Sequence, residues 1–139
     1  MAGVARIGIS LDEALLAAFD ALSRKRGYAN RSEAVRDLIR SELVRTEWED
    51  GNRATVGALC IIYEHDRHEL EHHLTHVQHQ KRSMVVSTLH VHLDAHNCME
   101  VIILRGGARR IRAFSDRIIA MKGVKHGDLV MGTTGADLH

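Results

Sequence analysis

The sequence predicts an α+β chain in two parts, a strand–helix–helix unit over residues 1–50 and a βαββαβ unit over residues 51–139. Three observations support this. Residues 5–10 alternate apolar and polar side chains, as a strand does. Two capping boxes, each a Ser or Asn followed three residues later by Glu, then open runs of helical periodicity. Beyond residue 55, segments of period two and period 3.6 follow one another in the order of a split ferredoxin-like unit.

The first strand is expected to need a partner, because a single strand of this length is not stable alone. Ile7 and Ile9 point to one side of it. The side chains on the opposite side are those of Arg6, Gly8 and Ser10.

Two short helices follow this strand. Ser10-Leu-Asp-Glu13 predicts the start of the first helix, and Gly27 predicts its end. Asn30-Arg-Ser-Glu33 predicts the start of the second. Two short helices and one unpaired strand would expose too much apolar surface, so we expect an intertwined dimer whose two strands pair antiparallel.

This pattern resembles the ribbon–helix–helix DNA-binding fold, in which a two-stranded ribbon enters the major groove. The resemblance implies base contacts from Arg6, bidentate to guanine, and a weaker contact from Ser10. Gly8 offers no side chain where the fold usually has a polar residue. Backbone amides near Asn30, Arg31 and Ser32 would clamp a phosphate. The alternative is a plain dimerisation module, since basic and acidic residues nearly balance in this part of the chain.

Residues 46–54 are polar around Gly51, and we interpret them as the linker. Trp48 within it is either an exposed aromatic residue or a plug between domains. The elements expected beyond the linker are a strand at 55–64, a helix at 66–80, strands at 84–94 and 98–104, a helix at 108–122 and a strand at 124–131. Such a unit has both helices on one side of an antiparallel sheet. The other side must be covered, most simply by another subunit.

The hairpin of this unit concentrates metal-binding residue types. Leu89, Val91 and Leu93 are expected to face a core, and Thr88, His90, His92 and Asp94 the opposite side. We expect Asp94-Ala95-His96-Asn97 to form the turn, since Asn is able to take a left-handed conformation.

Whether Cys98 joins the two histidines depends on the hairpin register. A three-residue loop over 95–97 pairs Asp94 with Cys98 and His92 with Glu100, and so puts His90, His92 and Cys98 on one face. Two imidazole nitrogens and a thiolate suit nickel, copper, zinc or cobalt rather than magnesium or calcium. The alternative is a solvent-facing histidine pair beside a buried cysteine.

The helix at 66–80 carries a second set of histidines. His68, His72, His76 and His79 fall opposite the apolar stripe of Leu70, Leu74 and Val77. We expect them to face water or a neighbouring chain, with weak metal binding as the alternative for all but the last. His79 lies at the end of the helix, where the hairpin of another subunit could meet it. His65 and His96 are expected to be surface or hydrogen-bonded residues rather than ligands.

Composition narrows the function classes. The net charge is +1, there are two cysteines, and no apolar run is long enough to cross a membrane. No signal segment precedes the first strand. We therefore expect a cytoplasmic protein with reduced thiols and no membrane partner.

The whole pattern is similar to the nickel-responsive transcriptional regulators (the NikR family). The similarity rests on Asn30-Arg-Ser-Glu-Ala34, Gln78-His79, Thr88-Leu-His-Val-His92 and Cys98-Met-Glu100. It implies an ACT-type C-terminal domain that forms a homotetramer core, flanked by two DNA-binding dimers. It also implies one Ni(II) per subunit in a square plane, bound by His90, His92 and Cys98 of one subunit and His79 of a neighbour. Glu100 and Tyr63 would orient the ligands.

The same resemblance implies a weaker cation site between the domains at Glu33 and Asp37, for which potassium is the candidate. The implied function is repression of nickel uptake genes through a palindromic operator. Alternatives are a metal storage or delivery protein that uses the helical histidines, a sensor for copper, cobalt or zinc, and a metallohydrolase with Glu100 as its base. A metallohydrolase would have no use for an N-terminal DNA-binding domain, so we expect no enzyme activity.

Overall fold

The structure, a computed structural model, describes residues 3–139 and falls into two compact units that divide between Arg40 and Ser41. The first unit holds α1 (Glu13–Lys25) and the first half of α2 (Arg31–Asp50). The second holds the remainder of α2, a four-stranded sheet and two further helices. Among the residues described, no helix combines the length and apolarity needed to cross a membrane.

Helix α1 starts two residues later than the capping box at Ser10 predicted. Its N-cap is Asp12, whose carboxylate accepts hydrogen bonds from the amides of Ala14 (2.8 Å) and Leu15 (3.2 Å). A single Asp oxygen thus satisfies two of the free amides of the first turn, which is why Asp12 and not Ser10 caps the helix.

The end of α1 lies where Gly27 predicted it. Gly27 has a φ of 80°, and the amide of Tyr28 donates to the carbonyl of Ser23 (3.1 Å). This is a Schellman cap, in which a residue without a Cβ takes the left-handed conformation at low cost.

Helix α2 begins as predicted and runs further than expected. The side chain of Asn30 accepts a hydrogen bond from the amide of Glu33 (2.9 Å). Arg31 donates two hydrogen bonds of 2.8 Å to Asp20 and so ties the start of α2 to α1. The helix continues to Asp50. The prediction of a linker over 46–54 was therefore wrong for residues 46–50, because polar composition alone does not end a helix.

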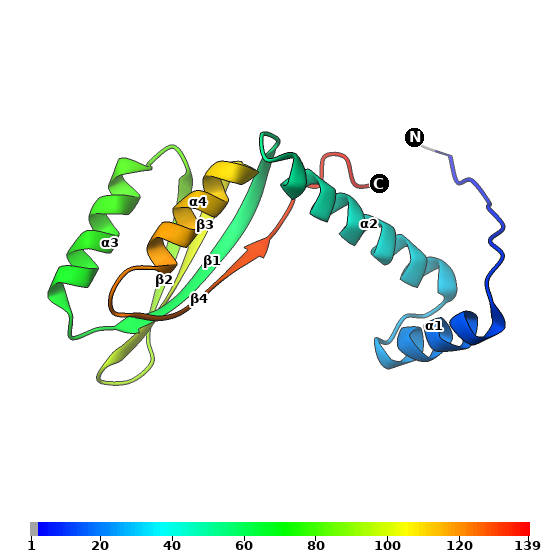
Figure 1. Ribbon diagram of the computed structural model, residues 1–139, viewed down its shortest axis with the longest axis horizontal. Helices are drawn as coiled ribbons and strands as arrows, with labels where there is room; N and C mark the ends of the chain where they lie inside the picture. The colour runs from blue at the N-terminus through cyan, green and yellow to red at the C-terminus, as the bar shows by residue number, and fades with distance from the viewer. Residues whose placement is uncertain (1–2) are drawn as a thin grey trace. The chain divides into compact units, whose positions relative to one another are not determined.

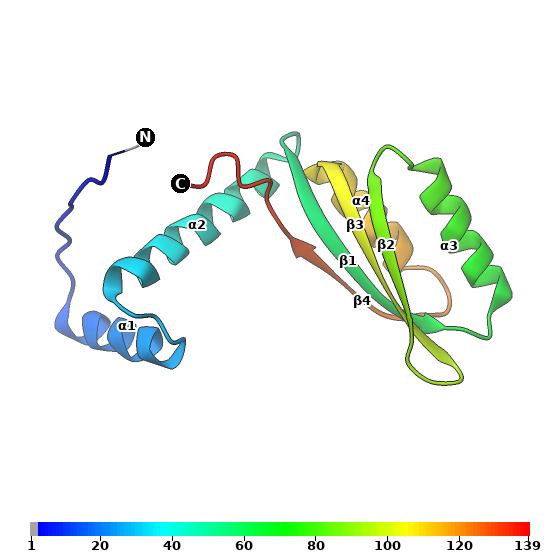
Figure 2. The same ribbon diagram turned by 180° about the vertical axis from the view of Figure 1, so that it is seen from behind.

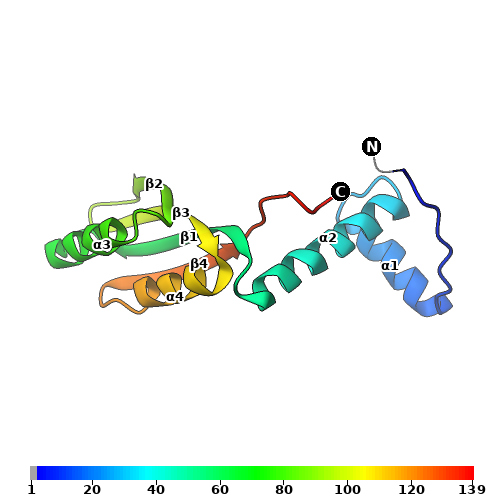
Figure 3. The same cartoon turned by 90° about the horizontal axis from the view of Figure 1, so that it is seen from above.

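The segment before α1 forms no hydrogen-bonded strand among the residues described (Figure 3). Its apolar side chains are exposed, Ile7 to 73% of its surface and Ile9 to 61%. A strand is defined by a ladder, and within one chain this segment has no neighbour to pair with. The intertwined ribbon therefore stays a prediction.

The second unit has the predicted βαββαβ order. Its elements are β1 (Ala54–Glu64), α3 (His68–Gln80), β2 (Val85–His92), β3 (Asn97–Gly107), α4 (Ala108–Ile119) and β4 (Val124–Met131). The strands lie in the order β2-β3-β1-β4, and every neighbouring pair is antiparallel. Helices α3 and α4 both lie on one side of the sheet (Figure 1), and the view from behind shows its other side without a helix (Figure 2).

The core of this unit lies between the sheet and the two helices. Odd-numbered residues of β1 and even-numbered residues of β3 are paired across the ladder and point into it, for example Leu59 opposite Ile102. Helix α3 contributes Leu70, Leu74 and Val77, as its apolar stripe predicted.

Three apolar residues of the hairpin, Leu89, Val91 and Leu93, do not face this core. Leu89 is 62% exposed, and Val91 and Leu93 are also exposed. The expectation that all three face a core was wrong for the single chain. Because β2 pairs with β3 in an even-to-even register, its odd-numbered side chains point to the open face of the sheet. Val130 of β4 lies on that face as well, at 60% exposure.

Trp48 is neither an exposed residue nor a plug between domains. It is 3% exposed and belongs to the core of the second unit. Its indole N–H donates to the carbonyl of Gly132 (2.9 Å), and the guanidinium of Arg112 lies 5.9 Å from its ring centre. A Cβ on Gly57 would come within 3.2 Å of the indole, so the absence of a side chain there makes room for it. The last turn of α2 is thereby fixed to the sheet.

We expect Trp48→Ala to lower the free energy of unfolding of the second unit by about 3–5 kcal/mol, the usual cost of removing a buried tryptophan. The measurement is urea unfolding followed by circular dichroism at one protein concentration. Glu49→Ala is the control, because it removes only an exposed ion pair with Arg45 and should cost at most about 1 kcal/mol. Equal losses for the two variants would contradict the assignment of Trp48 to the core.

Candidate metal centre

The β2–β3 hairpin has a three-residue loop, as predicted, but one position earlier in the chain. His92 pairs with Cys98 and His90 with Glu100. The amide of Leu93 donates to the carbonyl of Asn97 (2.9 Å), so residues 94–96 form the loop. The predicted pairs of Asp94 with Cys98 and His92 with Glu100 were therefore wrong. The odd loop length keeps even-numbered residues opposite each other, so His90, His92 and Cys98 share one face as predicted.

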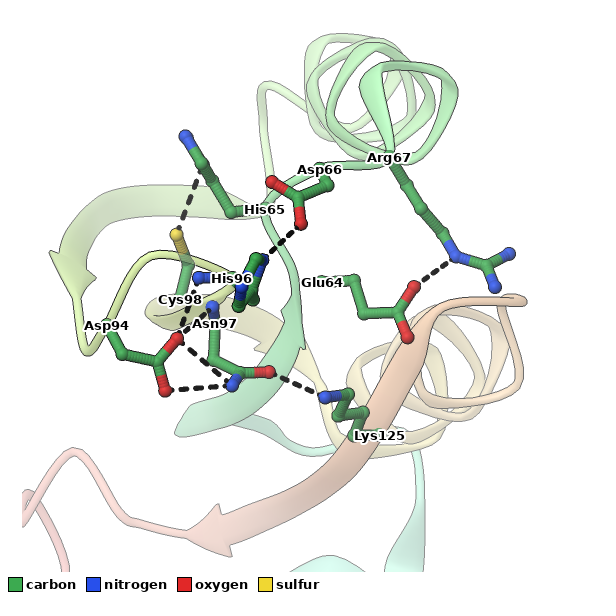
Figure 4. A network of polar contacts seen from close by, with 9 residues as sticks. All are labelled: Glu64, His65, Asp66, Arg67, Asp94, His96, Asn97, Cys98 and Lys125. Carbon is green, nitrogen blue, oxygen red and sulfur yellow. Dashed lines mark hydrogen bonds and ion pairs between the residues drawn. The ribbon is translucent and has the colours of Figure 1, made fainter.

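The side chain of Asp94 explains why the loop is shifted. Its carboxylate accepts hydrogen bonds from the amides of His96 (2.7 Å) and Asn97 (2.8 Å), which makes Asp94 the first residue of an Asx-type turn (Figure 4). The side chain of Asn97 donates to the same carboxylate and accepts from Lys125 (2.7 Å). These hydrogen bonds lower the pKa of Asp94 to about 2. No non-glycine residue within 3–139 has a positive φ, so Asn97 does not use the left-handed conformation open to it.

Four donor side chains converge beside this turn. They come from His65 after β1, His90 and His92 on β2, and Cys98 on β3, and their ligand atoms all lie within 4.8 Å of one another. The sulfur of Cys98 is 3.4 Å from Nδ1 of His92 and 3.4 Å from Nδ1 of His65. The His65 ring centre is 4.8 Å from that of His92. Two or three imidazoles and one sulfur at this spacing fit a borderline or soft divalent ion.

His65 is the residue that sequence reasoning missed. It lies just beyond the end of β1, and the register puts Tyr63 of that strand opposite Cys98 of β3. Its place at the metal centre therefore depends on strand pairing between distant parts of the chain. The one available signal was its position directly after a strand that neighbours the hairpin. Nδ1 of His65 also lies 3.3 Å from the carboxylate of Glu71, which restrains the ring.

His79 is not among the converging donors of the single chain. It is exposed near the end of α3 and lines a groove of about 450 Å³ with Gln78, Thr88 and Glu100. The single chain thus brings three of the four predicted metal ligands together and leaves the fourth at the surface.

The thiol of Cys98 is fully buried, whereas His90 and His92 are exposed. Burial is the main cause that raises the pKa of Cys98, and the nearby carboxylates of Glu71, Asp94, Glu100 and Asp66 add to it. The metal-free site therefore holds a protonated thiol at neutral pH. A cation bound here gains a thiolate by displacing that proton.

Tyr63 and Glu100 both lie beside the converging donors. The hydroxyl of Tyr63 is 3.2 Å from Nδ1 of His90, and burial raises the pKa of Tyr63, so the phenol stays protonated and restrains the imidazole. Glu100 lies opposite His90 in the ladder and accepts a hydrogen bond from the side chain of Gln78 (3.0 Å). Glu100 therefore connects β3 to the last turns of α3.

The residues predicted to contact DNA lie in the first unit. The segment with Arg6, Gly8 and Ser10 is exposed. The cap satisfies the amide of Glu33. The amides of Arg31 and Ser32 lie in the first turn of α2, where helix amides have no intrahelical acceptor and can bind a phosphate.

The predicted weak cation site already has protein partners. Glu33 accepts a hydrogen bond from Arg36 (2.5 Å), and Asp37 accepts one from the hydroxyl of Tyr28 (2.5 Å). A cation at these carboxylates would have to share or displace those contacts.

The chain matches known proteins over both units. Residues 56–132 match the family described as the NikR C-terminal nickel-binding domain, and residues 5–46 match the ribbon–helix–helix proteins of the CopG family. A protein of Geobacter sulfurreducens described as a nickel-responsive regulator is 53% identical over 134 residues, 96% of each chain. Relatives with the same description are 52% identical over the full length of both chains in Geobacter metallireducens and 47% identical in Pyrococcus furiosus, over 98% of this chain and 99% of that protein.

We expect the affinity of this centre for Ni(II) to rise with pH, because the ion must displace the proton of the Cys98 thiol, whose pKa lies above its ordinary value. The thiol alone predicts about a tenfold gain per pH unit between about pH 7 and 8. The measurement is chelator competition at several pH values. Cys98→Ser should bind more weakly and lose most of this slope, and a pH-independent affinity of the wild type would contradict the account.

Proposed function

Because the chain belongs to the nickel-responsive regulator family, we propose that Ni(II) held between its subunits controls its binding to a palindromic DNA operator. The family assignment confirms the resemblance seen in the sequence. The protein is a nickel-dependent transcriptional regulator with a ribbon–helix–helix DNA-binding domain, and it is not an enzyme. Its expected regulatory output is repression of nickel uptake genes.

The observation that supports the metal site best is the convergence of His90, His92 and Cys98 on one face of the hairpin. This donor set fits nickel, because imidazole and thiolate together suit borderline ions and exclude magnesium and calcium. When bound, the ion supplies a positive charge that joins donors from separate elements. We propose one Ni(II) per subunit, with His79 of a neighbouring subunit as the fourth ligand.

Two residues compete for the fourth ligand position. His65 already lies within 4.8 Å of the other three donors in the same chain. His79 is exposed at the end of α3, where a second chain can reach it. We favour His79 because a ligand from another subunit makes metal occupancy sensitive to assembly, whereas His65 would bind the metal in any assembly state.

The open face of the sheet supports a homotetramer of two dimers. Leu89, Val91 and Val130 are exposed there in the single chain. Apolar patches of this kind on a sheet face are usually buried against a partner. We propose that the second units meet through this face and that the first units pair through the segment around Arg6.

In the proposed complex the paired segments enter the major groove, where Arg6 contacts guanine and Ser10 makes a weaker contact. Gly8 brings the backbone close to the bases without reading them. The amides at the start of α2, near Asn30, Arg31 and Ser32, bind a phosphate. A weaker cation, for which potassium is the candidate, binds Glu33 and Asp37 once DNA is in place.

The hydrogen bond between Gln78 and Glu100 supports a structural coupling between metal binding and the position of α3. It joins the strand that carries Cys98 to the helix turn next to His79. A bound ion would therefore favour one arrangement of α3 and of the subunits it links. Ligands that bind one arrangement more tightly shift the population towards it, and here that arrangement is the one in which both DNA-binding dimers fit the operator.

We expect Ni(II) to strengthen binding of the wild type to a fragment of a nickel uptake promoter, and to have little effect on His90→Ala. The measurement is a mobility-shift or anisotropy titration with and without one equivalent of Ni(II) per chain. His126→Ala, which removes an exposed histidine on β4, should respond like the wild type. Equal DNA affinity for wild type and His90→Ala in both conditions would contradict the proposal.

Mixing subunits tests the origin of the fourth ligand. His79→Ala and His90→Ala chains should each lose tight nickel binding alone, and mixed oligomers formed by co-refolding should regain some intact sites. Such recovery requires that the ligands of one site come from two chains. If His79→Ala binds nickel like the wild type and His65→Ala does not, the fourth ligand is His65 and the intersubunit site is wrong.

A further inference from the structure

The solvent side of α4 carries a group of positive charges that takes no part in the metal centre. This helix, Ala108–Ile119, contains four arginines and a single acidic residue, Asp116. Its inner side is buried through Ile111, Phe114 and Ile118, where the helix lies along the sheet (Figure 1). All four arginines are exposed, so the outer side of α4 is strongly basic.

Two of these arginines already pack against the second unit. The guanidinium of Arg112 lies 5.9 Å from the ring centre of Trp48 and donates to the sulfur of Met131 (3.4 Å). The guanidinium of Arg109 lies against Gly51, where an added Cβ would come within 3.2 Å of it. Packing within the unit therefore explains why these two side chains lie where they do.

The other two arginines, Arg110 and Arg117, have no such contact. Within the part of the chain that the structure describes, neither side chain has a hydrogen bond, an ion pair or a ring contact. In the same unit, Arg45, Arg53 and Arg67 each pair with a carboxylate. A guanidinium carries only donors, so these two can bind an anion without giving up a protein partner.

Arg110 and Arg117 lie in one line along the helix. They are seven residues apart, which is close to two full turns, so both side chains leave the helix on the same side, about 10 Å apart along its axis. Ala113 lies between them, and its short side chain leaves the line open to close approach. Asp116 lies about 100° around the helix from Arg117, so its carboxylate does not interrupt the line.

This arrangement fits an extended polyanion better than a single anion. One small anion would have to draw together two side chains that start about 10 Å apart along the helix. One strand of B-DNA carries a phosphate for about every 3.4 Å of rise, so each guanidinium can reach its own phosphate of the same strand. Guanidinium groups bind phosphates with two parallel hydrogen bonds. Because the chain has a DNA-binding domain, DNA is the polyanion that it meets.

We propose that the outer side of α4 binds the phosphate backbone of double-stranded DNA through Arg110 and Arg117, as a contact additional to those of the first unit. The inference deepens the proposed function and rests on it, since operator binding by the first unit brings DNA to a chain whose two units are joined by α2. Contacts between guanidinium and phosphate touch no base edge, so α4 adds affinity and salt dependence but reads no sequence.

The test measures DNA affinity of the full-length protein, loaded with one equivalent of Ni(II) per chain, by anisotropy at several salt concentrations. Arg110→Gln combined with Arg117→Gln should make the slope of log affinity against log salt shallower by about 2 for each α4 that touches the DNA, because each phosphate contact contributes about 0.9. Arg110→Lys combined with Arg117→Lys should keep the wild-type slope, since lysine also neutralises a phosphate. Arg45→Gln combined with Arg53→Gln removes the same charge elsewhere and should also keep it.

Two DNA fragments of equal length separate this inference from the proposed function. The glutamine variant should lose the same slope on a nickel uptake promoter fragment and on a scrambled sequence, whereas Arg6→Ala should weaken binding to the promoter fragment only. A wild type without preference for the promoter fragment would contradict the proposed function, while the slope on the scrambled fragment would still decide on α4. The inference is overturned if the glutamine variant keeps the wild-type slope on either fragment, or if the lysine variant or the Arg45 and Arg53 control loses as much.

Discussion

The even-to-even pairing of β2 with β3 is the constraint on which the metal centre depends. It puts His92 opposite Cys98 and His90 opposite Glu100, so two imidazoles, a thiol and a carboxylate all point to the same side of the sheet. A slip of one residue would turn the two histidines to the open face and leave Cys98 behind. The Asx turn at Asp94 holds this register through hydrogen bonds to the next residues of the loop.

The same pairing decides which side chains of the hairpin are buried. The side of the sheet that faces α3 holds Cys98 at full burial and Tyr63 next to His90. A buried thiol resists ionisation, so Cys98 stays protonated without metal and would give up its proton to a bound cation. Binding chemistry and packing are therefore coupled, because Cys98 is both a candidate metal ligand and part of the core.

Burial of one face exposes the other. Leu89 and Val91 alternate with His90 and His92, so placing the two histidines on the helix side of the sheet turns these apolar residues to its open face. The open face of the sheet and the unpaired segment around Ile7 share one property, since both are apolar surfaces of a single chain. The chain belongs to a family that oligomerises, and the proposed assembly covers both surfaces. The histidines of α3 lie on neither of these surfaces.

The sequence by itself determined the order of the elements in the second unit, the α3 core stripe, the cap of α2 and the shared face of His90, His92 and Cys98. These follow from local periodicity, capping chemistry and the parity of an odd-length loop, all of which act within a few residues. Tertiary structure alone decided the place of Trp48 in the core, the outward direction of Leu89 and the presence of His65 beside Cys98. Each of these depends on contacts between segments far apart in the chain: α2 with β4, the hairpin with α3, and the end of β1 with β3. Local patterns carry no information on which distant segment will pack against them, and so could not predict these three positions.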